Sequence, residues 1–145
     1  MRSMAVLTGL LLVAACQAVP LAPPDSDAAG KRFDPPPPGQ SALYVVREGN
    51  FNSAFAHHIS VGSRVAGSLG SRQWLRIDVE AGKHVVRCQG ENVVTTPIEV
   101  AAGDIRFLEV TAIMGWNSAR CRMREIDAAT GRNQVLSSRR AEELH

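Results

Sequence analysis

The sequence predicts a mainly β domain, an antiparallel β-sandwich of seven or eight short strands with room for a short C-terminal helix. Short runs rich in β-branched and aromatic residues recur from residue 41 to residue 126, separated by turn residues. Turn signals about 8–12 residues apart are typical of a sandwich or barrel. No segment of helix length lies between the runs, and parallel neighbours usually need such a crossover, so antiparallel pairing is expected.

The expected strands follow one another closely along the domain. Residues 74–79 show the clearest alternation, with an apolar side chain at every second position. Pro97 has no backbone N–H, which predicts that its strand lies at a sheet edge or contains a bulge. A weakly amphipathic pattern predicts a helix at 134–144. In chain order, the expected strands cover residues 41–47, 56–61, 64–67, 74–79, 84–89, 93–100, 105–113 and 118–126.

The amino terminus resembles a bacterial lipoprotein signal. Residues 4–13 form a largely apolar run of signal-peptide length, too short to span a bilayer. Val13-Ala14-Ala15-Cys16 follows and matches the recognition sequence of such signals. The resemblance implies removal of residues 1–15, diacylglycerol on Cys16 and usually a third acyl chain, which together make a stable anchor. The alternative is an ordinary cleaved signal beside an incidental cysteine.

Residues 16–40 carry most of the prolines, and their composition predicts a flexible tether ahead of a domain at 41–145. The four prolines at 35–38 predict a stiff polyproline II spacer that would hold the domain away from the membrane. The alternative is that these prolines bind an aromatic groove. Gln17 follows the cysteine where an aspartate would signal retention, so the lipoprotein sorting rule implies the outer membrane, with the domain facing the periplasm.

The charge balance argues against nucleic acid as a partner. The chain carries 16 Lys and Arg against 14 Asp and Glu, a formal net charge of +2 at pH 7. Nucleic-acid-binding domains usually present a strongly basic surface. We therefore expect no nucleic-acid binding.

Two cysteines remain if Cys16 carries lipid. Cys88 and Cys121 each lie on the apolar face of an expected strand. The cell envelope is oxidising, which favours a disulfide between them. The alternative is a pair of buried free thiols, which behave as small apolar side chains.

A hairpin, a strand and a second turn carry a family resemblance. The hairpin is the glycine-containing run Val61-Gly62-Ser63-Arg64-Val65-Ala66-Gly67-Ser68-Leu69. The strand at 74–79 follows, and Gly82-Lys83-His84 then turns into the next strand. Over roughly residues 31–136 this pattern resembles the envelope lipoprotein family catalogued as domain of unknown function 2846. The resemblance implies a small envelope β domain and brings no activity or catalytic residues.

No arrangement of residues predicts catalysis or a cofactor. The sequence has no nucleophile elbow, no phosphate-binding loop and no carboxylate pair typical of glycosidases. Adjacent residues of a regular strand face opposite ways, so His57 and His58 cannot both bind one metal. We expect no enzyme, no metal and no cofactor. The rival interpretation is a small hydrolase or ligand-carrying domain that uses His57, His84 or the cysteines.

An arginine row is one candidate partner-binding surface. Arg120, Arg122 and Arg124 alternate along an expected strand and therefore share one face. Such a row could contact phosphate headgroups, lipopolysaccharide or an acidic partner strand. The alternative is a solvated sheet face whose arginines pair with acids on the neighbouring strand.

Aromatic loops are the other candidate surface. Phe51, Phe55 and Trp116 lie in expected loops, and exposed apolar patches often mark contact sites. The alternative is that these rings close the end of the sandwich as core. Of the two surfaces we favour the aromatic loops, and we expect a non-catalytic interaction or assembly module, with an envelope protein as partner.

Overall fold

The computed structural model describes residues 18–49 and 51–144. The predicted signal peptide and the lipidation site Cys16 lie outside the described residues. Within the described part, no helix has the length and apolarity that crossing a bilayer requires. In chain order the elements are α1 (Pro24–Gly30), β1 (Gln40–Arg47), β2 (His57–Val61), β3 (Arg64–Leu69), β4 (Gln73–Glu80), β5 (Gly82–Gln89), β6 (Val93–Val100), β7 (Ile105–Met114), β8 (Ala119–Ile126), α2 (Ala128–Leu136) and β9 (Arg139–Arg140).

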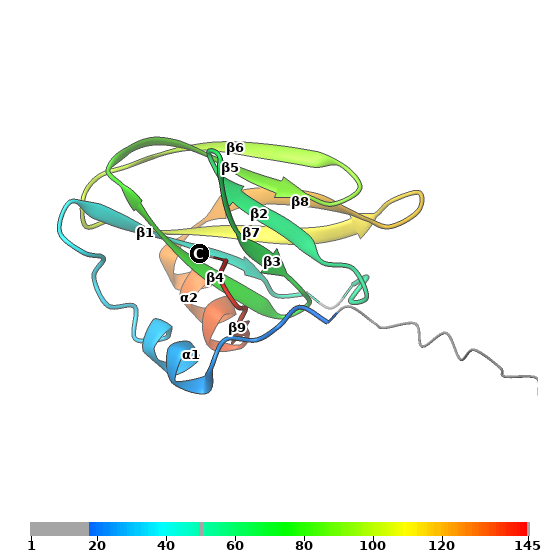
Figure 1. Ribbon diagram of the computed structural model, residues 1–145, viewed down its shortest axis with the longest axis horizontal. Coiled ribbons are helices and arrows are strands. Elements are labelled where there is room, and N and C mark those ends of the chain that lie inside the picture. Colours follow the sequence, from blue (N-terminus) through cyan, green and yellow to red (C-terminus); the bar gives the residue numbers. More distant parts are fainter. Residues whose placement is uncertain (1–17, 50, 145) are drawn as a thin grey trace, which may run out of the picture.

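Two sheets pack face to face and form a β-sandwich, which confirms the predicted fold class (Figure 1). One sheet has five strands in the order β8-β7-β1-β4-β9, and the other has four in the order β3-β2-β5-β6. Each of the eight expected strands is present, with bounds within two residues of those predicted. Pro97 lies in β6, which is an edge strand as expected.

The pairing is not purely antiparallel, and this part of the prediction is wrong. β1 runs parallel to β7, with Val46 opposite Glu109 at the end of the ladder, and β9 runs parallel to β4. The chain reaches β7 from β1 by way of strands of both sheets, so no crossover helix is needed. The parallel arrangement places the ends of β1 and β7 at the same end of the sandwich.

The main core lies between the sheets. Alternate residues such as Leu43, Val45 and Leu108 point into it, and each is fully buried. Cys88 of β5 and Cys121 of β8 form a disulfide across this core, with their Cα atoms 6.3 Å apart. The bridge joins an inner strand of the four-stranded sheet to the edge strand of the other sheet.

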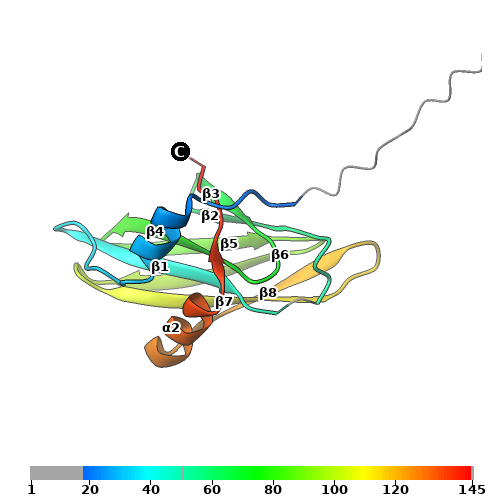
Figure 2. The same cartoon turned by 90° about the horizontal axis from the view of Figure 1, so that it is seen from below.

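The prediction of a flexible tether over 16–40 is wrong for its described part, because residues 18–40 fold onto the five-stranded sheet. Figure 2 shows α1 and α2 in front of this sheet. Gly30 lies against the ring of Trp74, and its carbonyl accepts a 2.8 Å hydrogen bond from the Tyr44 hydroxyl. Phe33 is buried with Tyr44 and Phe107 in a second apolar cluster. The outer face of the five-stranded sheet carries several aromatic side chains, and residues 18–40 shield them from water.

The C-terminal helix lies earlier than the predicted 134–144. Asp127 is its N-cap and accepts a 2.9 Å hydrogen bond from the Thr130 backbone N–H, which starts α2 at Ala128. The residues after α2 form β9 and a bridge between Leu21 and Ala141 instead of continuing the helix. The chain is extended there because both β4 and the N-terminal segment pair with it.

Candidate functional site

The aromatic loops lie at one end of the sandwich, which we call the loop end. Phe51 and Phe55 belong to the loop at 48–56 after β1, and Trp116 belongs to the loop at 115–118 after β7. Because β1 and β7 are parallel, both loops leave the five-stranded sheet in the same direction (Figure 1). The structure therefore brings these three predicted residues to one end.

These rings are exposed and do not close the core. The exposed fraction is 51% for Phe51, 41% for Phe55 and 98% for Trp116. Met114, at the end of β7, is 73% exposed and adds a fourth large apolar side chain, which is not among the residues predicted for this surface. Of the two interpretations of the aromatic loops, the geometry agrees with an exposed contact surface.

A buried arginine holds the first loop. Arg47 is 1% exposed and donates hydrogen bonds to the backbone carbonyls of Phe55 at 2.6 Å, Phe51 at 2.8 Å and Asn52 at 3.0 Å. Burial lowers the pKa of Arg47, but a guanidinium remains charged in proteins. Hydrogen bonds from a charged donor are strong, so Arg47 holds the backbone at both phenylalanines and at Asn52.

His57 belongs to the same buried network. Its Nδ1 lies 3.1 Å from Nη1 of Arg47, and its Nε2 lies 3.3 Å from the carbonyl oxygen of Arg120. Burial, and then the charge of Arg47, lower the pKa of His57. Both ring nitrogens have partners, so this histidine is not free to act as a base or metal ligand.

The other residues that the rival interpretation would use, His84 and the two cysteines, also have partners in the structure. Nε2 of His84 lies 2.7 Å from the backbone carbonyl of Glu80, and the two cysteines are bridged. Among residues 18–49 and 51–144 no cluster of three or more metal-ligating side chains occurs. A shallow depression of about 460 Å³ beside His84 lies over β5 and β6, and its lining includes Val85 and Pro97.

Glu91 holds the second loop. Its carboxylate accepts backbone hydrogen bonds from Trp116 at 2.8 Å, Asn117 at 2.7 Å and Ser118 at 2.8 Å. These bonds lower the pKa of Glu91. No local pattern in the sequence at residues 90–92 indicates that the turn between β5 and β6 reaches the β7–β8 loop.

Asn92 ties the same turn to the edge of β8. Its side chain accepts a 2.6 Å hydrogen bond from the Cys121 N–H and donates a 3.0 Å bond to the Cys121 carbonyl. It therefore pairs with β8 as a neighbouring strand would. Asn92 and the disulfide therefore both join the two sheets near the loop end.

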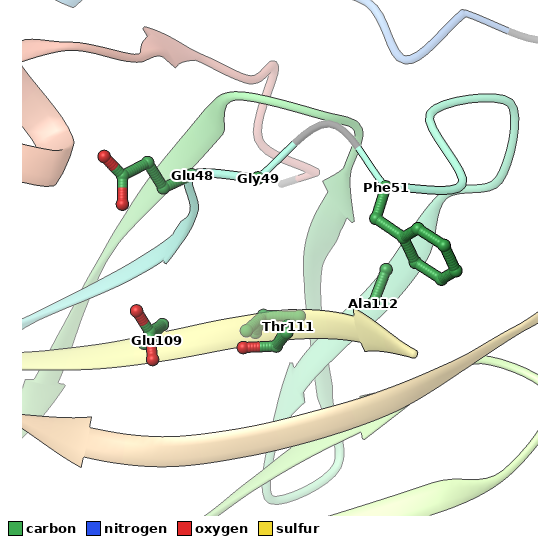
Figure 3. A pocket seen from close by; sticks show the side chains of 7 residues that line it. Glu48, Gly49, Phe51, Glu109, Thr111 and Ala112 are labelled. Atoms are coloured by element: carbon green, nitrogen blue, oxygen red, sulfur yellow. The ribbon is translucent and has the colours of Figure 1, made fainter. Parts of the chain in front are cut away.

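A small cleft lies between the first loop and β7. Residues lining it include Glu48, Phe51, Glu109 and Ala112, and its volume is about 160 Å³. Figure 3 shows Phe51 extending from its loop toward Ala112 at the end of β7. Pockets for small molecules usually enclose about 300–1,000 Å³. The loop end is therefore better suited to surface contact than to enclosing a small ligand.

The arginine row is present on the outer face of β8. Arg120, Arg122 and Arg124 are all exposed. Arg124 forms an ion pair of 2.8 Å with Glu109 on β7. Arg120 lies opposite Ile113 and Arg122 opposite Thr111, so neither has an acid across the strand pair. The row is thus partly paired, and two of its charges remain in solvent.

Comparison of the chain with protein-family models, with curated proteins and with solved structures found no match, so the family resemblance described above stays a prediction.

Proposed function

We propose that the chain is a lipoprotein of the bacterial outer membrane, facing the periplasm, whose sandwich is a non-catalytic interaction module. The signal at 1–15 followed by Cys16 is the observation that carries the anchoring part of this proposal. The resemblance to the envelope family catalogued as domain of unknown function 2846 supports the same location. The partner belongs to the envelope, either an envelope protein or the membrane itself.

The interaction part of the proposal is supported by the way in which the loop end is built. Three aromatic rings are exposed there, while the backbones that carry them are fixed by the buried Arg47 and by Glu91. Ordering a contact surface before binding reduces the conformational entropy lost on association. Aromatic residues on such a surface commonly supply most of the binding energy.

Acyl labelling of the protein in cells tests the anchor. The wild-type chain should take up labelled fatty acid, and Cys16→Ser should not. The variant should then accumulate as an uncleaved precursor or be released as soluble protein. Equal labelling of the two proteins would disprove the anchor.

Photocrosslinking in cells tests the interaction surface. A benzophenone amino acid in place of Trp116 should yield an adduct with an envelope protein or lipid. The same amino acid in place of Val65 is a matched control, because Val65 is 53% exposed and lies near the hairpin at the other end of β3. Equal adduct yields from the two positions would show that the loop end is not a specific contact surface.

A further inference from the structure

The described chain begins beside the loop end. Ala18 and Val19 line a cleft of about 180 Å³ together with Phe55 and its neighbours in the 48–56 loop. The Val19 carbonyl accepts a 3.3 Å hydrogen bond from the Gln73 side chain, at the start of β4. Figures 1 and 2 both show the first described residues at this end of the sandwich.

This position limits how far the domain can lie from a lipid anchor. Cys16 precedes Ala18 by two residues, and two residues span at most about 7 Å. Because residues 18–40 are folded onto the sheet, they cannot act as the spacer that their composition suggests. Acyl chains on Cys16 would therefore bring the bilayer against the loop end.

The chemistry of the loop end fits the boundary between water and lipid. Tryptophan is enriched at membrane interfaces, and exposed Trp, Phe and Leu are typical of surfaces that lie in this layer. Trp116 and Met114 are the two most exposed large apolar side chains among the described residues. The carboxylate of Glu91 is satisfied by three backbone N–H groups, and the charge of Arg120 lies close enough to it to lower its pKa. Glu48 is also exposed, and a membrane contact would have to leave its carboxylate in water.

We propose that the loop end docks on the bilayer that holds the acyl chains of Cys16, with Trp116, Phe51 and Phe55 among the lipid headgroups. This inference rests on the proposed lipidation of Cys16 and specifies the partner of the proposed contact surface. A protein partner is less consistent with the geometry, because it would have to fit between the bilayer and a surface that the anchor holds within a few residues of it.

Tryptophan fluorescence of the acylated full-length protein in vesicles of phosphatidylethanolamine and phosphatidylglycerol tests the proposal. The chain has two tryptophans, of which Trp74 is fully buried and Trp116 is 98% exposed. On vesicles, the Trp116 emission should move to shorter wavelength and become less sensitive to quenching by acrylamide. Lipids brominated on the upper acyl chain should quench it instead.

Two variants make the signal specific. Trp116→Phe retains only Trp74, whose emission should be the same with and without vesicles. Ala102→Trp in the Trp116→Phe background places a reporter in the exposed turn between β6 and β7, at the opposite end of the sandwich, where acrylamide should quench it equally in both conditions.

The outcomes separate the two proposals. Mass spectrometry that finds no acyl chain on the protein would overturn the lipoprotein assignment, and the docking inference with it. Acylated protein whose Trp116 remains open to acrylamide on vesicles would overturn the docking inference alone. Shielding of Trp116 only after envelope proteins are added would also overturn it and would assign the loop end to a protein partner.

Discussion

Arg47 and His57 form a hydrogen bond of 3.1 Å between Nη1 and Nδ1 at the buried base of the 48–56 loop. A guanidinium can only donate, so Nδ1 of His57 must be an acceptor. The ring proton then lies on Nε2, from which it is donated to the carbonyl of Arg120. The native structure therefore requires a neutral His57, and protonating the ring would place two positive charges together in the core.

This requirement predicts a loss of stability in mild acid. The pKa of His57 is lowered from its ordinary value of 6.5, so the unfolded chain binds a proton below that pH while the native chain does not. The free energy of unfolding should fall by up to about 1.4 kcal/mol per pH unit as the pH drops from 6.5 toward the native pKa. Urea unfolding at a series of pH values measures this slope.

His57→Asn should remove the slope, since an asparagine oxygen can still accept from Arg47 and does not titrate. His58→Asn is the matched control, because the neighbouring His58 is exposed. That variant should keep the wild-type pH dependence. An unchanged slope in His57→Asn would show that another group causes the acid sensitivity.

Gly30→Ala tests whether the proline-rich segment is packed as described. A Cβ at Gly30 would clash with the Trp74 ring, whereas a Cβ at Gly49 would meet no atom within 4 Å. Overpacking of this kind costs about 1–3 kcal/mol. We expect that loss in the free energy of unfolding for Gly30→Ala, and little change for Gly49→Ala. Equal stability of both variants would mean that the segment does not lie on Trp74.

Strands β1 to β8 are predictable from the sequence because alternation and turn residues are local signals. The packing of residues 18–40 is not predictable, because its causes are distant along the chain. The Arg140 N–H donates a 2.6 Å hydrogen bond to Asp27, which lies 113 residues earlier. Composition alone indicates that this segment cannot form a core, and it does not reveal an aromatic sheet face that needs cover.

The exposed aromatic residues of the candidate site are predictable from the sequence. The residues that hold their loops in place are not. Aromatic residues are unusual in a loop of Gly, Asn and Ser, so they can be recognised in the sequence. Arg47 and Glu91 look like ordinary charges at the end of a strand and in a turn. Their partners are backbone groups of the loops that carry the aromatic rings. Every residue has the same backbone groups, so a sequence pattern cannot identify these partners.

Removing the disulfide should destabilise the domain substantially. Cys88 and Cys121 are separated by 33 residues and are almost completely buried. Loss of a native disulfide from a small secreted domain typically costs about 2–5 kcal/mol. Cys88→Ala combined with Cys121→Ala should lower the free energy of unfolding by this amount in urea titrations.

Thiol labelling gives an independent check of the bridge. In denaturant without reductant, neither Cys88 nor Cys121 should react, and both should react after reduction. Rapid labelling of both thiols before reduction would rule the bridge out.

Glu91→Gln should loosen the loop that carries Trp116. The carboxylate accepts three backbone hydrogen bonds, and an amide oxygen is a weaker acceptor with a neighbouring NH₂ group that cannot accept. Amide hydrogen exchange at residues 116–118 should be faster in the variant. The lowered pKa of Glu91 means that the wild-type bonds are kept above the ordinary carboxyl pKa and are lost only as the pH falls through the native value. Exchange rates that match the wild type would contradict this role.

Two double variants distinguish the aromatic loops from the arginine row as the contact surface. Phe51→Ala with Trp116→Ala removes two exposed rings, so the thermal midpoint should change little, since surface substitutions usually alter stability by less than about 0.5 kcal/mol. An interface anchor contributes roughly 2 kcal/mol, or about 30-fold in affinity. Crosslinking from a benzophenone at position 55 should therefore fall sharply.

Arg120→Ala with Arg122→Ala should leave this crosslinking unchanged, because exposed charges are screened beyond about 8 Å at physiological salt. A large drop in the thermal midpoint of the aromatic variant would show that its rings are core. Retained crosslinking there, with a salt-sensitive loss in the arginine variant, would assign the contact to the arginine row.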